Sequence, residues 1–530
     1  LVNWYYKYNP TISSYHGINQ YDSQLEKFNL NFIEEYKADI NRFIIELSQI
    51  DESDLNQKHL IDYSIINEFL HDLYNKSYNL NYNSYSPNYF LNIIYDSLFL
   101  IIYNNNLDMD SKVDSIVKRL KLIQLSISEI KTSLIYYSKY EIDKSTQLIL
   151  MINQLLDNLP LSINSDINTL DLIDKIIAEI KNELHGLQGY MNSNITKSNK
   201  IDKQSIVSKQ LLHNSENYIA TDYSYNIKNT QLDMFNIALP IYLKNNDEPV
   251  WVDREDTLKV INYVLQGLYD KFPGKDEIIS TLNTSINNID IFFKNIPGFK
   301  NAMNYDYEII INNDIYLDQN QLYRFLWNNN NETLFFLNNS PYYNNKNLLQ
   351  LFNKYKLDLY NMSNSFPGNY WQSTQLKDDE FLITDIAVNN YTRYGWGLFS
   401  QYIAVDNGYG EDENNYYTLT HFYNVINSVM RIMIFNDYYI NEKDKDEILS
   451  ELYNLTFYDM HEIENIFYDV TDNLFLESNF EAIGYLRLKE LYKKYISIPK
   501  YDKSKFYSTL LEHSHIDLSL IKQFKLNLND

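Results

Sequence analysis

The sequence has 530 residues, of which 45% are hydrophobic and 22% charged, a composition typical of soluble globular proteins. The formal net charge of −25 argues against a nucleic-acid partner and against docking on an anionic membrane surface, because both bind through lysine and arginine. The absence of cysteine excludes disulfides, thiolate catalysis and cysteine-based zinc sites. With only 12 glycines and 10 prolines, tight turns are scarce, so we expect a large, mainly α-helical fold with at most a small β element.

Helical periodicity is clearest near the amino terminus. Apolar side chains recur every three or four positions over residues 32–50, 116–134 and 167–184, which predicts three amphipathic helices with one buried stripe each. The most apolar stretch, residues 89–103, is interrupted by Asn92 and Asp96 and is shorter than a membrane span requires. We therefore expect a buried helix at this position and no transmembrane segment in the chain.

The pattern changes along the chain in a way that predicts two lobes. We expect residues 1–190 to form an N-terminal helical lobe. Residues 191–245 are polar, which predicts a loop, an insertion or a lobe boundary. Residues 246–530 form an expected C-terminal lobe. Within it, residues 304–318 alternate enough to suggest a short strand pair, and the Asn-rich residues 326–347 suggest a surface loop.

The nine histidines provide no familiar metal motif. "HEIEN" (461–465) lacks the second histidine of the zinc motif H-E-x-x-H. "LEHSHID" (511–517) places His513 and His515 close to two carboxylates, and these two histidines are the weak candidates for metal ligands. Phosphate-loop, dinucleotide and nucleophile-elbow motifs are missing. Taken alone, the residues predict no active site and no cofactor.

Two segments resemble a known family. "SNSFPGNYWQ" (363–372) and "RYGWGLFSQYI" (393–403) are similar to a bacterial family, domain-of-unknown-function family 885, which resembles zinc metallopeptidases of mainly helical fold. The family pattern is His-Glu-x-x-Pro-Gly-His-x-x-Gln, followed by Glu-Gly-Trp-Ala-Leu-Tyr-x-Glu. The matching positions are Pro367, Gly368, Gln372, Gly395, Trp396 and Leu398, with Phe399 in the place of the tyrosine.

Weaker matches extend the resemblance over nearly the whole chain. They follow the order of the family at residues 5–25, 86–101, 429–439, 481–491 and 506–521, and they keep an arginine and a tyrosine of the family. The resemblance implies a helical zinc-peptidase-like fold with a cleft. The residues that it implies as possible lining of that cleft are Pro367, Gly368, Gln372, Trp396, Arg431 and Tyr485.

The metal ligands and the catalytic base of the family are replaced in this chain. Under the resemblance, the two metal-binding histidines fall on Ser363 and Asn369, and the catalytic glutamate falls on Asn364. The two glutamates of the second element fall on Tyr394 and Gln401. Zinc is held by imidazole, thiolate or carboxylate groups, and asparagine cannot act as a general base. The replacements therefore imply a degenerate site without metal or catalytic residues.

The leading hypothesis is a catalytically inactive relative of the family that acts as a binding or interaction protein through its cleft or surface, with an unidentified peptide or protein ligand. One alternative is an active metal-dependent hydrolase or peptidase with relocated ligands, and a second is a surface or assembly protein. The resemblance also favours an extracytoplasmic location, because members of the family are often secreted or lipid-anchored.

Overall fold

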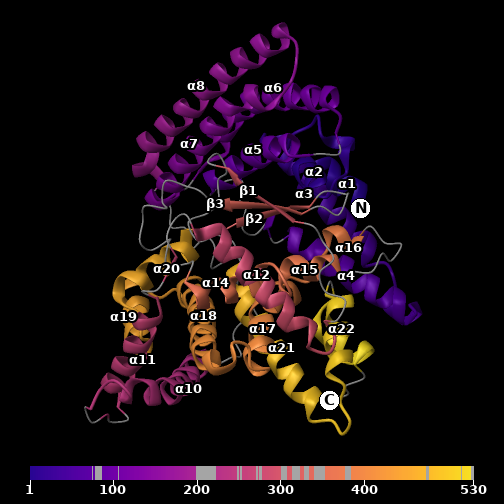
Figure 1. Cartoon of the computed structure of the whole chain (residues 1–530). Coiled ribbons are helices and arrows are strands. Elements are labelled where there is room, and N and C mark those ends of the chain that lie inside the picture. Colours follow the sequence, from indigo (N-terminus) through magenta and orange to yellow (C-terminus); the bar gives the residue numbers. More distant parts are fainter. Residues whose placement is uncertain are drawn as a thin grey trace. The chain divides into compact units, whose positions relative to one another are not determined.

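The structure of the chain is a computed structural model (Figure 1). The residues that it describes are 1–74, 76–77, 86–104, 107–135, 137–198, 223–247, 250, 253–269, 272–273, 277–299, 307–312, 323–327, 333–338, 353–375, 383–472, 477–514 and 516–526.

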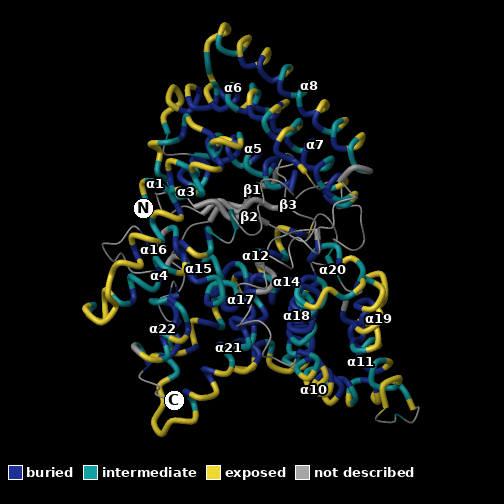
Figure 2. The backbone as a smooth tube through the Cα atoms, turned by 180° about the vertical axis from the view of Figure 1, so that it is seen from behind, coloured by how far each residue is buried: buried dark blue, intermediate teal, exposed yellow. Residues whose placement is uncertain are grey.

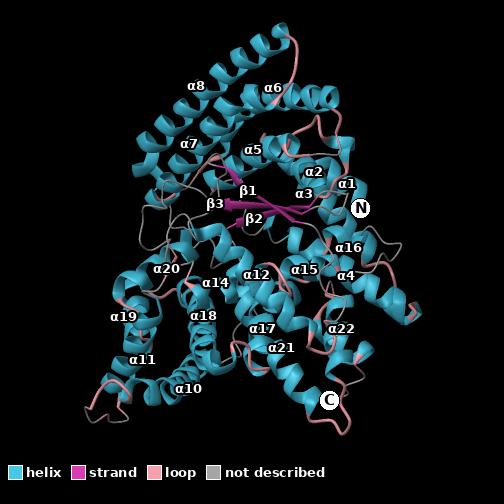
Figure 3. Cartoon of the chain, viewed as in Figure 1, coloured by secondary structure: helices cyan, strands magenta, loops and turns pink. Residues whose placement is uncertain are grey.

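The chain divides into two compact units. Unit 1 comprises Leu1–Gln210, Tyr305–Pro341 and Asp472–Leu474, and unit 2 comprises Leu211–Asn304, Tyr342–Thr471 and Phe475–Asp530. The predicted lobes followed the order of the chain, whereas unit 1 also takes a segment from the middle of the sequence. Both units are mainly α-helical, as predicted, and the strands form one small sheet in unit 1 (Figure 3).

The helices of unit 1 confirm the predicted periodicity. Helix covers residues 32–47, 116–133 and 167–184 of the three amphipathic stretches, and Ile50, the last residue of the first stretch, is exposed beyond the helix end. Buried and exposed residues alternate along α6, α7 and α8 (Figure 2). The elements of unit 1 are α1 (Val2–Tyr8), α2 (Pro10–Tyr15), η1 (Asn19–Tyr21), α3 (Leu30–Leu47), η2 (Glu52–Asp54), α4 (Gln57–Tyr74), α5 (Pro87–Ile102), α6 (Met109–Ser133), α7 (Lys139–Ser162) and α8 (Ile167–Ser198).

Helix α5 is the predicted buried helix. Leu91, Ile94 and Leu98 have no exposed surface and belong to one apolar cluster with side chains of α6, α7 and α8. Burial of such side chains stabilises each by about 1.5–3 kcal/mol. Among the helices that the structure describes, none is long and apolar enough to cross a membrane.

The sheet corrects two sequence-based expectations. Strands β1 (Tyr307–Asn312), β2 (Tyr323–Trp327) and β3 (Thr333–Asn338) are ordered β1-β3-β2, with β1 parallel and β2 antiparallel to β3. Of the predicted strand pair within residues 304–318, the described residues 307–312 form β1, and the partner of β1 is β3, which lies further along the chain and not within this stretch. The predicted surface loop 326–347 is also wrong in part, since "TLFFLN" forms β3 inside it.

Unit 2 is built from helices alone among its described residues. Its elements are α10 (Tyr223–Leu243), α11 (Arg254–Tyr269), α12 (Ile278–Lys294), α14 (Lys354–Asn364), α15 (Asn369–Thr374), α16 (Ile383–Ile386), α17 (Asn390–Asp406), η8 (Glu411–Glu413), α18 (Asn414–Phe435), η9 (Asn436–Ile440), α19 (Lys445–Leu455), α20 (Met460–Asp472), α21 (Glu477–Ile496), α22 (Lys503–Glu512), α23 (Leu518–Leu520) and η10 (Ile521–Lys525).

The polar segment 191–245 contains more helix than predicted. Helix α8 continues to Ser198, and α10 occupies 223–243, so the loop interpretation is wrong for both stretches. Tyr223, Ile227 and Met234 are buried on α10 at helical spacing. This buried stripe starts inside the polar segment, so the average composition of residues 191–245 does not reveal it. The remainder, 199–222, lies outside the described residues.

Candidate functional site

A tight chain reversal follows α14, at the Pro-Gly pair of the family-like motif. The side chain of Asn353 caps the start of α14, and the helix ends at Asn364 before a cis peptide bond between Phe366 and Pro367. A Cβ atom on Gly368 would lie 2.0 Å from the carbonyl oxygen of Ser363. No side chain fits in that space, so glycine is required for the backbone to pass this close.

The glycine and tryptophan of the second motif join α17 to its neighbours. Trp396 has no exposed surface, and its indole Nε1 donates a hydrogen bond to the carbonyl oxygen of Pro367 (2.6 Å). A Cβ atom on Gly395 would lie 2.3 Å from the carbonyl carbon of Gly484 on α21. These family-like residues therefore bring α17 against both the α14–α15 turn and α21.

A continuous set of hydrogen bonds crosses the position of the degenerate motif. Ser363 Oγ donates to the carbonyl oxygen of Gly397 (2.9 Å) and accepts from Gln401 Nε2 (2.6 Å). Gln401 Oε1 lies 3.1 Å from Nδ1 of His421, and Nε2 of His421 lies 3.1 Å from the hydroxyl of Tyr485. We call Ser363, Gln401, His421 and Tyr485 the buried network, because each is less than a tenth exposed. Four helices, α14, α17, α18 and α21, contribute one residue each.

The partners of Gln401 determine where the protons of His421 lie. Gln401 Nε2 also donates to the carbonyl oxygen of Leu359 (3.2 Å), which orients the amide, and Oε1 accepts from Asn424 Nδ2 (3.1 Å). Oε1 can only accept, so Nδ1 of His421 carries the proton, and Nε2 accepts from Tyr485. Burial, with a smaller effect from the charge of Lys489, lowers the pKa of His421 to about 3. The imidazole is therefore neutral at physiological pH.

The other degenerate positions make contacts of their own. Asn364 is half-buried, and its Nδ2 donates to the carbonyl oxygen of Tyr360 (3.0 Å). The side chain of Asn369 lies next to Gly397, and its Oδ1 is buried without a hydrogen-bond partner. The half-buried ring of Tyr394 stacks on Phe480 of α21, with ring centroids 6.4 Å apart.

The residues expected to line a cleft are involved in structural contacts. Arg431 is half-buried, forms an ion pair with Asp469 (2.5 Å) and donates from Nε to Asn427 Oδ1 (3.1 Å). Its guanidinium is thus held by its own helix and by α20. The others lie in the packed interior and not on an open surface: Pro367, Gly368, Gln372, Trp396 and Tyr485.

The donor set at the degenerate motif does not fit a zinc ion. Ser363 supplies a hydroxyl, Asn369 an amide and Tyr394 a phenol, which are poor ligands compared with imidazole or carboxylate. The imidazole of His421 is close, but both of its nitrogens already make hydrogen bonds to Gln401 and Tyr485. Within the described part of the chain, no group of three or more His, Asp or Glu side chains is placed to hold a metal ion.

The histidine candidates from the sequence lie elsewhere. His461 is exposed on α20, and its Nε2 is 3.3 Å from Asn465 Nδ2, which occupies the second-histidine position of H-E-x-x-H. His513 is half-buried directly after α22. His515 lies outside the described residues.

Sequence reasoning missed His421, which links the two halves of the buried network. One local signal was available: His421 lies four residues from both Tyr417 and Val425, on the buried stripe of α18. That spacing identifies a buried histidine. It does not identify the hydrogen-bond partners, since they come from three other helices.

Solved structures share this fold over nearly the whole chain. A predicted lipoprotein of unknown function from Shewanella oneidensis has 15% identity and a TM-score of 0.70, covering 99% of this chain and 98% of its own. A predicted lipoprotein from Colwellia psychrerythraea has 12% identity and a TM-score of 0.73, covering 98% of this chain and 96% of its own. No family model and no curated protein matches the chain. The chain thus has the mainly α-helical fold of these two proteins.

Proposed function

We propose that the chain is a catalytically inactive relative of the zinc-metallopeptidase-like family and acts as a binding protein. The observation that carries this proposal is the buried network of Ser363, Gln401, His421 and Tyr485. All four side chains are neutral, and their polar atoms are occupied by one another or by backbone carbonyl groups. In an active relative, the same region would have to expose a metal ion and a water molecule.

The chemistry of hydrolysis supports the same conclusion. A general base must accept a proton near neutral pH, and it must reach the attacking water. Asn364 cannot accept one, and its amide is directed to a backbone carbonyl within its own helix. His421 has a pKa of about 3 and no free nitrogen, so it does not replace the missing base.

Turnover of a peptide library tests this proposal. The purified chain is incubated with the library in added zinc, with and without a chelator, beside an active zinc peptidase as a positive control. We expect no cleavage above that of a heat-denatured sample. Chelator-sensitive cleavage that disappears in His513→Ala or His515→Ala would contradict the proposal and support a hydrolase with relocated ligands.

We also infer an extracytoplasmic location. The support for the location is that both similar structures belong to predicted lipoproteins, and the family-like segments agree with it. Digestion of intact source cells with an added protease measures the location. The chain should be degraded while a cytoplasmic marker survives, and survival of both would contradict this location.

A further inference from the structure

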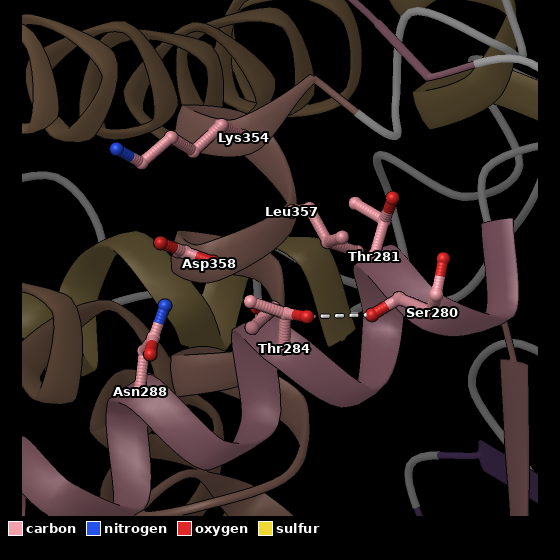
Figure 4. A pocket seen from close by; sticks show the side chains of 8 residues that line it. Ser280, Thr281, Thr284, Asn288, Lys354, Leu357 and Asp358 are labelled. Carbon is pink, nitrogen blue, oxygen red and sulfur yellow. Dashed lines mark hydrogen bonds between the residues drawn. The ribbon is translucent and has the colours of Figure 1, made fainter. Parts of the chain in front are cut away.

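Unit 2 contains a polar pocket between α12 and α14, apart from the buried network. Its volume is about 280 Å³, and Figure 4 shows the side chains that line it. Ser280, Thr284 and Asn288 are four residues apart on α12 and therefore form one stripe. Lys354 and Asp358, four apart on α14, face this stripe. The pocket thus brings hydroxyl, amide, ammonium and carboxyl groups together.

A buried carboxyl group is fixed at the inner side of the pocket. Asp358 is 3% exposed and accepts hydrogen bonds from the hydroxyls of Tyr417 (2.6 Å) and Tyr409 (2.9 Å). Burial raises its pKa, and hydrogen bonds from Ser285 and the two tyrosines oppose that rise. A titratable side chain held in this way within a cavity is typical of binding sites.

The remaining groups provide both donors and acceptors. Ser280 Oγ donates to the carbonyl oxygen of Glu277 (2.8 Å), and Thr284 Oγ1 donates to that of Ser280 (2.7 Å). Each hydroxyl has given its only proton, so its oxygen can accept from a ligand. Lys354 pairs with Glu413, and its ammonium has three N–H donors. Asn288 is exposed and offers both a donor and an acceptor.

These charges and lone pairs select a neutral ligand. Lys354 is already paired with Glu413, and Asp358 is a carboxyl group, so the pocket offers no unpaired positive charge to an anionic ligand. The net charge of −25 on the chain also disfavours anion binding. A ligand with an ammonium group would be repelled by the ammonium group of Lys354. Hydroxyl groups both donate and accept, so they match every group described above. The volume of about 280 Å³ lies just below the range for ligand pockets, about 300–1,000 Å³, so the ligand is about the size of one ring.

We propose that this pocket binds a neutral polyhydroxylated six-membered ring, such as a monosaccharide or a cyclitol. The proposal goes beyond the function proposed above, because it concerns a different site and a different ligand. Its failure would therefore leave the catalytic inactivity of the buried network unaffected, and detection of peptide cleavage would leave the pocket unaffected.

Calorimetric titration of the full chain with D-glucose and with myo-inositol tests the proposal, and glycine (a zwitterion), methylammonium and inorganic phosphate serve as probes with charged groups. We expect saturable binding of a polyol with a dissociation constant in about the millimolar range, as for other small polar ligands. Glycine, methylammonium and phosphate should each bind more weakly than the polyol. Absence of saturable polyol binding, or tighter binding of any of the three charged probes, would overturn the proposal.

Matched variants locate the binding. Asn288→Leu and Thr284→Val remove polar atoms from the pocket at exposed positions, and each should weaken polyol binding about tenfold. Asn287→Leu changes the adjacent exposed residue, which does not line the pocket, and should bind as the unmodified chain does. Equal affinities of all three variants would place the ligand elsewhere and overturn the proposal.

Discussion

Protonation of His421 should destabilise the folded chain in mildly acidic solution. The pKa of His421 is about 3 in the folded state, against 6.5 for an unperturbed histidine, and desolvation by burial is the main cause. As pH falls through 6.5, the unfolded chain takes up a proton that the folded chain does not. The contribution of neutral His421 to the free energy of unfolding is therefore fully present above pH 6.5 and is lost progressively between pH 6.5 and 3.

The magnitude follows from the two pKa values. The imidazole is completely buried, so the shift needs no reduction for exposure to solvent. At about 1.36 kcal/mol for each unit of pKa, the whole shift corresponds to about 5 kcal/mol. Between pH 7 and pH 5 the unfolded state gains about 2 kcal/mol from protonation of this one residue. Such a change is a large fraction of the stability of an ordinary protein, about 5–15 kcal/mol.

Urea unfolding of the unmodified chain and of His421→Gln, measured from pH 5 to pH 7, isolates this contribution. Burial also raises the pKa values of Asp358 and Glu481, and proton uptake by these carboxyl groups in the folded chain acts in the opposite direction. Their effects are common to both proteins and cancel in the difference. The unmodified chain should lose about 2 kcal/mol more than the variant on going from pH 7 to pH 5. Parallel curves, agreeing within about 0.5 kcal/mol, would refute the reasoning.

Two further predictions concern the residues around the network. Gly368→Ala should destabilise the chain strongly, because the added Cβ would lie 2.0 Å from a carbonyl oxygen. Gly267→Ala serves as its control: the added Cβ would have no atom within 4 Å, and alanine should stabilise α11 by about 0.5–1 kcal/mol. Equal melting temperatures for these two variants would contradict the close backbone approach. Tyr485→Phe should lower the free energy of unfolding by about 1–3 kcal/mol, because a buried imidazole nitrogen loses its donor. The control is Tyr402→Phe, because the hydroxyl of Tyr402 makes an exposed hydrogen bond; this variant should change the free energy of unfolding by less than about 0.5 kcal/mol in the same urea measurement. Similar losses in both variants would contradict the stabilising role of the buried network.

The helices of unit 1 were predictable because their burial follows a local pattern. In α6, Ile116, Leu120, Ile123 and Ile127 have no exposed surface, and their spacing of three and four is visible in the sequence. The same holds for α5, where a run of apolar residues indicated burial on most sides. These features depend only on residues within one helix.

The sheet and α10 were not predicted because their signals are not local or are diluted. The partner of β1 is β3, which begins at Thr333, and residue spacing within β1 contains no information about it. The apolar stretch of β3 is flanked by asparagines, so a compositional average describes it as a loop. In α10, the polar residues around Tyr223 and Ile227 hide the start of the buried stripe.

The candidate site was predictable only in part. The resemblance located Ser363 and Gln401, and the structure brings these two into direct hydrogen-bond contact. It did not indicate His421, because that residue belongs to no family-like segment and meets Gln401 only through the packing of α18 against α17. The Pro-Gly pair was identified as part of a motif, but the need for glycine arises from the path of the backbone at Ser363.

The zinc content of the purified chain tests the central claim most directly. The chain is produced with added zinc, purified without chelators, dialysed and measured by elemental analysis. Because the buried network leaves no imidazole or carboxylate for the ion at Ser363, Asn369 and Tyr394, we predict far less than one zinc ion for each chain. Retention of one zinc ion for each chain, lost in Gln401→Leu but kept in His513→Ala, would contradict the account.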